Sequence, residues 1–200
     1  MDFTALKTAL EGRGYRVSVF STGKEAADYL DCEIDGETVG FGGSMTLRTL
    51  GLYDKLLTHN TVLWHSRRTG ELERRHDMRK AMTADVYLSS VNGIAETGEI
   101  VNIDGIGNRV SGTLFGHKRV YFVVGRNKVA PTLAAAIDRA RNVAAPKNAA
   151  RLGKRTPCVV DGRCHDCSSP DRICRELAIL WQMPMEGNYE IVLIDEDLGF

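Results

Sequence analysis

The sequence predicts an α/β fold built on an open, mainly parallel sheet. Segments that alternate apolar and polar residues, as strands do, are separated by helical patterns of roughly ten residues, an order typical of βαβ units. With 200 residues, 43% of them hydrophobic, the chain can form one domain with a sizeable core. We expect a single domain over 1–200, with 1–36 as a helix and strand that lead into it and 156–175 as a cysteine-rich segment.

The first half of the chain is expected to alternate helices with strands. Apolar residues at helical spacing over 2–11 end at Gly12, and 15–20 alternates as a strand before a second helix over 24–34. The same patterns predict strands over 39–41 and 61–66, a helix from Met45 that Gly51 interrupts, and an amphipathic helix over 71–82.

The second half is expected to carry four more strands and one long helix. The strands are the apolar runs 85–91, 99–103, 119–124 and 189–194, of which 99–103 adds an antiparallel element. Pro131 suits the first position of a helix over 131–144, and Pro146 breaks or restarts that helix. A further helix is expected over 171–180.

Bulk charge gives no sign of a polyanionic partner. Lys and Arg number 26, as do Asp and Glu, so the net charge is zero, and we expect neither nucleic acid nor a membrane as partner. The most basic region is 139–155, where a solvated helix face is favoured over a binding patch. The chain starts without a secretory pattern and holds no apolar run near the roughly 18 residues of a membrane span, so a cytoplasmic protein is expected.

A glycine-rich turn between a strand and a helix is the first candidate for ligand binding. Gly42 and Gly43 allow backbone N–H groups to approach an anion, and Ser44 or Thr46 could cap the helix or donate to a carboxylate or phosphate. An ordinary capped turn is the alternative. The motif is neither a P-loop nor a dinucleotide fingerprint, so no NAD or flavin is predicted.

The stretch from Asp85 to Asn127 gathers polar residues at the ends of its apolar runs, where an α/β sheet presents a ligand site. The guanidinium of Arg109 fits a carboxylate, although it could instead pair with Asp104 or Glu99. The predicted ligand-binding residues of this stretch are Ser89, Ser90, Asn92, Asn102, Asp104, Asn108, Arg109, Gly125, Arg126 and Asn127, with Lys128 closing the same turn.

Four cysteines lie close together in the sequence. Cys158, Cys164, Cys167 and Cys174 have the spacing C-x5-C-x2-C-x6-C, which could bind zinc or an iron–sulfur cluster, with His165 as a substitute ligand. Only one CxxC pair is present, so the zinc-ribbon pattern is incomplete. Redox-active thiols, activated by nearby arginines, and a purely structural role are the alternatives.

Several of these segments together resemble the LUD family, the lactate-utilisation proteins, formerly a domain of unknown function. The resemblance rests on 39–54, 84–110, 123–129, 141–149, 156–174 and the final EDLGF. It implies the Rossmann-like open sheet of the sugar-phosphate isomerase and CoA-transferase superfamily. It also implies a part in the conversion of L-lactate to pyruvate or related organic-acid metabolism, beside an iron–sulfur protein partner.

The resemblance leaves several functions open. The first is binding of a small carboxylate or phosphate-bearing ligand, and the second is a non-catalytic assembly subunit for an iron–sulfur partner. A third is transferase-like or hydrolase activity centred on Glu99, which occupies a place similar to the acidic residue of CoA-transferase sites. Homo-oligomerisation is a further expectation, and whether the protein is an enzyme stays open.

Overall fold

A computed structural model describes residues 1–200 and shows an α/β fold around a six-stranded parallel sheet. Its order is β1-β10-β7-β4-β2-β3, and all five strand pairings are parallel. The strands are β1 (Arg16–Phe20), β2 (Thr38–Phe41), β3 (Thr61–Leu63), β4 (Val86–Ser89), β7 (Arg119–Gly125) and β10 (Tyr189–Ile194). Since β1 pairs with β10, residues 1–36 are part of the core architecture.

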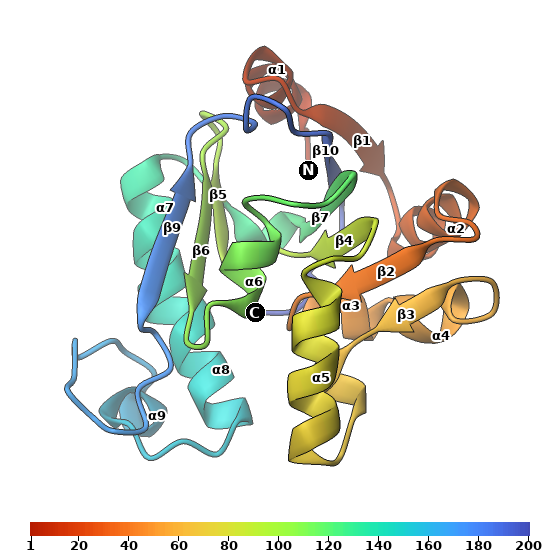
Figure 1. The fold of residues 1–200 in the computed structure, drawn as a ribbon. Coiled ribbons are helices and arrows are strands. Elements are labelled where there is room, and N and C mark those ends of the chain that lie inside the picture. The colour runs from red at the N-terminus through yellow and green to blue at the C-terminus, as the bar shows by residue number, and fades with distance from the viewer.

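A second, four-stranded sheet lies beside the first (Figure 1). Its order is β8-β5-β6-β9, in which β6 is antiparallel to both of its neighbours. The strands are β5 (Gly93–Ala95), β6 (Ile100–Asp104), β8 (Val129–Ala130) and β9 (Glu176–Leu180). The predicted antiparallel element at 99–103 is therefore confirmed, and it belongs to a separate sheet.

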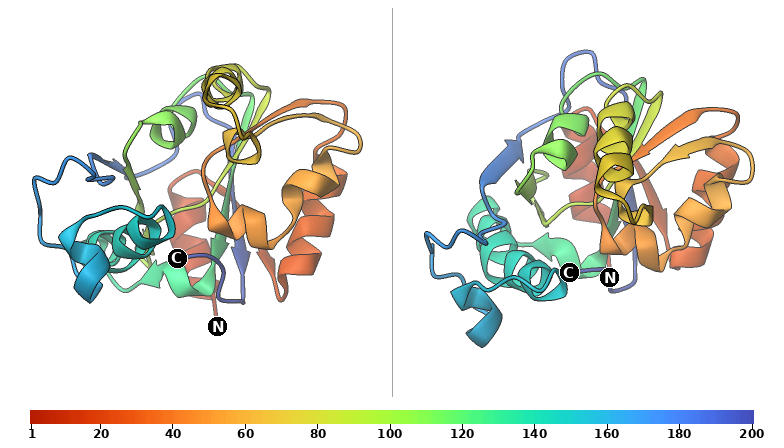
Figure 2. Two further views of the ribbon diagram at one scale, coloured as in Figure 1. Left: turned by 90° about the horizontal axis from the view of Figure 1, so that it is seen from below. Right: turned by 60° about the horizontal axis from the view of Figure 1, so that its bottom comes forward.

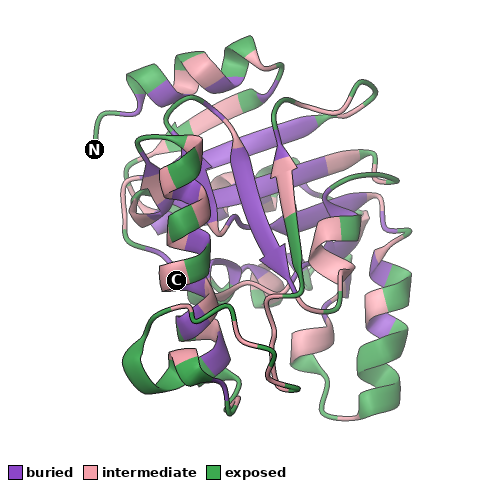
Figure 3. Ribbon diagram, turned by 90° about the vertical axis from the view of Figure 1, so that its left-hand side faces the viewer, coloured by how far each residue is buried: buried purple, intermediate pink, exposed green.

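Both faces of the central sheet are buried, which explains its nearly continuous apolar strands. In β7, Tyr121 and Val123 face one core cluster, while Phe122 and Val124 face the other. Figure 3 shows the strands mostly buried and the outer faces of the helices exposed. On one face pack α2 (Gly23–Glu33), α3 (Met45–Thr49) and α4 (Leu52–Leu56), and on the other pack α1 (Thr4–Gly12) and the second sheet.

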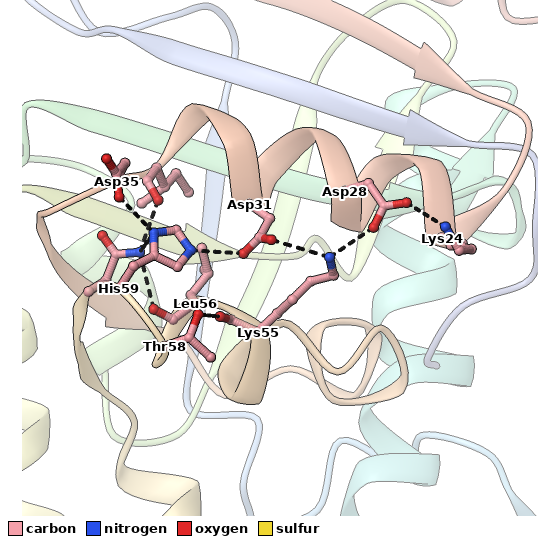
Figure 4. A network of polar contacts seen from close by, with 10 residues as sticks. Lys24, Asp28, Asp31, Asp35, Lys55, Leu56, Thr58 and His59 are labelled. Atoms are coloured by element: carbon pink, nitrogen blue, oxygen red, sulfur yellow. Dashed lines mark hydrogen bonds and ion pairs between the residues drawn. The ribbon is translucent and has the colours of Figure 1, made fainter.

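A chain of ion pairs joins α2 to α4 and the residues after it (Figure 4). The ammonium of Lys55 lies 2.8 Å from Asp28 and 3.3 Å from Asp31. The imidazole of His59 contacts Asp31 at 3.0 Å and Asp35 at 2.8 Å.

The remaining helices surround the second sheet and one end of the central sheet. A short 3-10 turn (His65–Arg67) leads into α5 (Glu71–Ala81), and α6 (Asn108–Gly112) follows β6. A second 3-10 turn (Arg126–Lys128) follows β7. Helices α7 (Leu133–Arg139) and α8 (Ala145–Arg151) are continuous through a π-helical turn (Ala140–Ala144), and α9 (Pro157–Asp161) follows. Helices α8 and α9 lie on the side of the second sheet, away from α2 and α4 (Figure 2).

Most predicted elements are confirmed, and two details are wrong. Residues 176–180 form strand β9, which pairs with β6, where a helix was predicted. Pro131 precedes the N-cap Thr132, whose hydroxyl accepts the N–H of Ala135, so it is outside the helix. Pro146 lies in the first turn of α8, where the α-helical pattern resumes after the π-helical turn, so the predicted restart at this proline is confirmed.

No helix combines the length and the apolar character that crossing a bilayer requires.

Candidate functional site

A cavity of about 690 Å³ lies at the carboxyl ends of four parallel strands. Gly43 and Ser44 follow β2, His65 follows β3, and Ser90 follows β4. Lys128 reaches the cavity from the turn after β7. The opposite wall comes from the β6–α6 turn, the end of α8 and residues 170–175. This is the edge at which open α/β sheets bind ligands.

The turn after β2 has the geometry that its sequence predicts. The Ser44 hydroxyl accepts the backbone N–H of Leu47 at 3.2 Å and so caps α3. A side chain on Gly42 would meet the hydroxyl of Ser89 at 3.0 Å and the Arg109 side chain at 3.4 Å. Glycine at this position therefore lets the turn lie against the neighbouring strand end, with Gly43 and Ser44 on the cavity wall.

Lys128 is the most buried cation of the cavity, with 4% of the residue exposed. Its ammonium donates to Thr46 Oγ1 at 2.9 Å and to Ser90 Oγ at 3.0 Å, and it has no carboxylate partner. Burial lowers the pKa of Lys128 to about 7, with additional lowering from the guanidinium charges of Arg139 and Arg109. A substantial part of this lysine is therefore an uncharged amine at neutral pH.

Arg109 lies on the cavity wall without an acidic partner. The carboxylate of Asp104 accepts the backbone N–H groups of Arg109 and Val110, at 2.8 and 3.0 Å, and so caps α6. The guanidinium donates to the carbonyl of Ile103 at 2.8 Å, and its Nε has no hydrogen-bond partner. Neither predicted ion pair, to Asp104 or to Glu99, forms.

The cavity is strongly cationic although the chain is neutral. Its 31 lining residues include nine Lys or Arg but only two acids, and both acids are engaged by backbone N–H groups. Arg68 and Arg172 pair with Asp77 and Asp166. Seven cations make no ion pair: Arg48, Arg74, Arg109, Lys128, Arg151, Lys154 and Arg175. Cations that gather around one cavity without carboxylate partners form a binding site for anions.

One histidine lies among these cations. Burial lowers the pKa of His65, and the charge of Arg74 lowers it further. Its Nε2 lies 3.3 Å from the hydroxyl of Ser66. His65 is therefore neutral at physiological pH and can accept or donate one hydrogen bond in the cavity.

Residues 170–175, which we call the arginine strap, close the cavity opposite the strand ends. The Arg172 guanidinium donates to the carbonyls of Cys167 and Cys174, both at 2.8 Å. Arg175 donates to the carbonyls of Arg172 and Pro170. A side chain on Gly105 would lie 2.4 Å from the carbonyl of Ile173, so the strap lies directly against the β6–α6 turn.

The four clustered cysteines are unpaired thiols of intermediate exposure. Nowhere do three or more Cys, His, Asp or Glu side chains converge on a position suited to a metal ion. His165, the predicted substitute ligand, is paired with Asp161 at 2.9 Å. As arranged, these residues do not fit zinc or an iron–sulfur cluster, and the metal site at Cys158, Cys164, Cys167 and Cys174 stays a prediction.

Glu99 lies outside the cavity. Its carboxylate is 2.6 Å from the guanidinium of Arg13 and also accepts the hydroxyl of Thr97. Arg13 in turn donates to the carbonyl of Thr97 at 2.7 Å. The pair fastens the end of α1 to the turn between β5 and β6. This placement supports a structural role, and the predicted catalytic role of Glu99 stays a prediction.

Half of the predicted ligand-binding residues line the cavity: Gly43, Ser44, Ser90, Asn92, Asp104, Asn108 and Arg109. The others support it or lie elsewhere. Thr46, Ser89 and Asn102 are buried behind the wall, and Thr46 holds Lys128. Gly42 lies close to the side chains of Ser89 and Arg109, and Gly125 lies close to the backbone of 196–198. Arg126 pairs with Asp195 and Asp197, and the Asn127 side-chain oxygen accepts the N–H of Leu198.

The model of the LUD domain family matches residues 4–194 of the sequence. The chain belongs to the LUD domain family. It is thus related in general to lactate utilisation, and the family match includes the N-terminal segment that the sequence resemblance left out. No protein of curated function matches the sequence.

The chain is also similar to a solved structure. The crystal structure of a DUF162 family protein from Deinococcus radiodurans matches with a TM-score of 0.52 and 12% identity. The match covers 97% of this chain and 99% of the other. At this identity the likeness shows the fold alone, and it confirms the predicted α/β architecture. An iron–sulfur protein partner and a homo-oligomer stay predictions.

Most of the unpaired cavity cations were not predicted from the sequence as ligand-binding groups. Arg48 and Arg74 lie on separate helices, and Arg151 and Lys154 belong to the basic region for which a solvated helix face was favoured. One sequence feature relates to the wall opposite the strand ends: Gly105 permits the close approach of the arginine strap. The strap lies far from Gly105 in the sequence, so the contact could not be predicted from a local pattern.

Proposed function

We propose that this LUD domain binds a small organic acid, or a phosphorylated relative of one, through the anionic groups of the ligand. The protein would thereby serve lactate utilisation or related organic-acid metabolism. The observation that carries the proposal is the set of seven Lys and Arg side chains that face one cavity without a carboxylate partner. Arg109, whose Nε has no hydrogen-bond partner, is the group best placed to hold the first anionic group.

The size and chemistry of the cavity support an anion that carries more than one polar group. A volume of about 690 Å³ lies within the usual range for small-molecule sites. Ser44, Ser90 and Asn92 supply neutral hydrogen-bonding groups to the same cavity as Arg109. Such groups fix the orientation of hydroxyl or carbonyl substituents, whereas arginine forks hold carboxylate or phosphate.

Thermal unfolding in the presence of small anions tests the proposal. A ligand that binds only the folded protein stabilises it by about 2.7 kcal/mol at a hundred times its Kd. We expect lactate, pyruvate, citrate or phosphate to raise the melting temperature more than sodium chloride of equal ionic strength. Lactamide, which replaces the carboxylate of lactate with a neutral amide, should have no effect. Equal responses to lactate and lactamide, or to all salts, would contradict anion recognition.

A further inference from the structure

Lys128 is buried in the cavity without the carboxylate that normally accompanies a buried ammonium. It lies behind the wall formed by Ser90 and the β2–α3 turn, with 4% of the residue exposed. Its contacts are two hydroxyl groups, Thr46 Oγ1 at 2.9 Å and Ser90 Oγ at 3.0 Å. An ammonium that served only to attract anions would be more effective at a less buried position. The other cations of the cavity are all less buried than Lys128.

The surroundings of Lys128 favour its neutral amine. Burial and the positive charges of Arg139 and Arg109 all act against the charged form. The carboxylates nearest to the site do not compensate, since Asp104 caps α6 through its contacts with backbone N–H groups. Desolvation and a neighbouring cation both favour the neutral amine, and the neutral amine is the form of lysine that acts as a nucleophile.

The two hydroxyl groups beside Lys128 are hydrogen-bonded to each other. Ser90 Oγ donates to Thr46 Oγ1 at 3.2 Å, and Thr46 Oγ1 donates to the carbonyl of Leu198 at 3.2 Å. Both hydroxyls also contact the lysine nitrogen. A group that attacks a carbonyl and later expels water needs proton transfer, and both hydroxyls are placed to exchange a proton with the lysine nitrogen.

We propose that Lys128 forms an imine with a carbonyl-bearing organic acid, such as a 2-oxo acid, bound in this cavity. The lone pair of Nζ attacks the carbonyl carbon, and a proton passes from nitrogen to the carbonyl oxygen. The nitrogen also gives up its second proton to that oxygen, which leaves as water, and a carbon–nitrogen double bond remains. Water is the only other product, and the step needs no oxidant or reductant. The inference rests on the proposed anion binding and adds the class of ligand.

Reductive trapping tests the imine directly. The full chain is incubated with pyruvate, 2-oxoglutarate or dihydroxyacetone phosphate and then treated with sodium cyanoborohydride, which reduces an imine to a stable amine. Intact mass and peptide mapping should show one adduct per chain, on Lys128, with at least one of these compounds. Lys128→Arg, which keeps the charge but cannot form an imine, should lose the adduct completely. Lys147→Arg, at an exposed position on α8, is the matched control and should retain it.

The corresponding alcohols separate this inference from the proposed function. Lactate, 2-hydroxyglutarate and glycerol 3-phosphate carry the same anionic groups but have no carbonyl, so they should reduce trapping at Lys128 by competition. If they raise the melting temperature while no carbonyl compound labels Lys128 in the unsubstituted protein, the imine is overturned and anion binding stands. If neither response occurs, both proposals fail. Labelling spread over surface lysines would likewise overturn the imine.

Discussion

The carboxylate of Asp104 accepts the backbone N–H of Arg109 at 2.8 Å, while the guanidinium of the same arginine turns to the carbonyl of Ile103. The two residues are thus bound to each other without forming an ion pair. Asp104 neutralises the N-terminal end of α6, and the side-chain charge of Arg109 is left for the cavity. An acid only five residues away therefore supports the anion site without occupying it.

Arg109→Gln should weaken anion binding without unfolding the protein. Glutamine keeps a hydrogen-bond donor for Ile103 but removes the charge. A charge-assisted hydrogen bond is worth about 1.5–3 kcal/mol, which corresponds to roughly a tenfold to hundredfold rise in Kd. Isothermal titration calorimetry, with the anion that raises the melting temperature most, would measure this change in Kd.

Arg126→Gln is the matched control for this substitution. Arg126 was also predicted from the sequence to bind ligand, but it pairs with Asp195 and Asp197 outside the cavity. Its replacement should leave the Kd nearly unchanged. Equal weakening by both substitutions would mean that general surface charge, and not the cavity, attracts the anion.

Gly105→Ala should displace the arginine strap. The added methyl would lie 2.4 Å from the carbonyl of Ile173, and neither backbone segment can move without shifting its neighbours. Overpacking of this kind costs about 1–3 kcal/mol. Because Arg172 and Arg175 move with the strap, anion affinity should fall together with the melting temperature.

Gly12→Ala provides the comparison, since an added methyl there meets nothing within 4 Å. It lies at the end of α1, where alanine should be neutral or stabilise by up to about 1 kcal/mol. Unchanged affinity and stability in Gly105→Ala would show that the strap does not depend on its contact with the β6–α6 turn.

The central sheet was predictable because its strands are buried on both faces. Such strands are short apolar runs in the sequence. The strands at 119–124 and 189–194 could therefore be predicted without knowing what they pack against. Strand β9 was different: only its pairing with β6 makes 176–180 extended, and its two most exposed residues, Glu176 and Leu177, obscure the pattern. A helix was therefore predicted where a tertiary contact decides the structure.

The candidate site was predictable on one wall only. Residues at strand ends such as Ser44 and Ser90 follow from topology, because parallel strands end at one edge of the sheet. The facing cations come from α5, α8 and the strap, which are far apart in sequence. A net charge of zero conceals them, since the compensating acids lie mostly outside the cavity. The burial of Lys128 likewise depends on segments that no local pattern connects.

Glu99→Gln should lower stability and leave anion binding unchanged. Burial by itself would raise the pKa of Glu99, but the hydrogen bonds from Thr97 and Arg13 outweigh it, and the pKa lies below its usual value of 4.5. The stabilisation is therefore present above that value and is lost as the pH falls through the lower folded-state pKa. At neutral pH we expect a loss of about 1 kcal/mol in urea unfolding. A large effect on ligand binding or on any turnover would instead restore a functional role for Glu99.

His59 should make the α2–α4 contact sensitive to pH. Hydrogen bonds with Asp31 and Asp35 raise the pKa of His59 above 6.5 (Figure 4). The contribution to stability is thus fully present below the unfolded value and is lost as the pH rises through the folded-state pKa. His59→Gln should be less stable than the unsubstituted protein at about pH 5.5, and the difference should shrink by about pH 8.5. A difference that is constant with pH would exclude the charged imidazole as its cause.

Lys128→Met should stabilise the protein, because the lysine opposes folding while it is charged. Its pKa falls from 10.5 to about 7 on folding, so between these values the unfolded chain binds more protons than the folded one. Stability of the unsubstituted protein should therefore rise with pH across this window, by up to about 1.4 kcal/mol per pH unit, and the cost of burial is complete below it. Methionine fills a similar volume without the charge, and the hydroxyls of Ser90 and Thr46 still bond to each other. We expect the substituted protein to be more stable at about pH 6, with an advantage that declines as the pH rises.

Lys147→Met, at an exposed site, should keep the pH slope of the unsubstituted protein. If Lys128→Met keeps that slope as well, the ammonium is not destabilised by its surroundings, and both the lowered pKa and the nucleophilic role would be wrong.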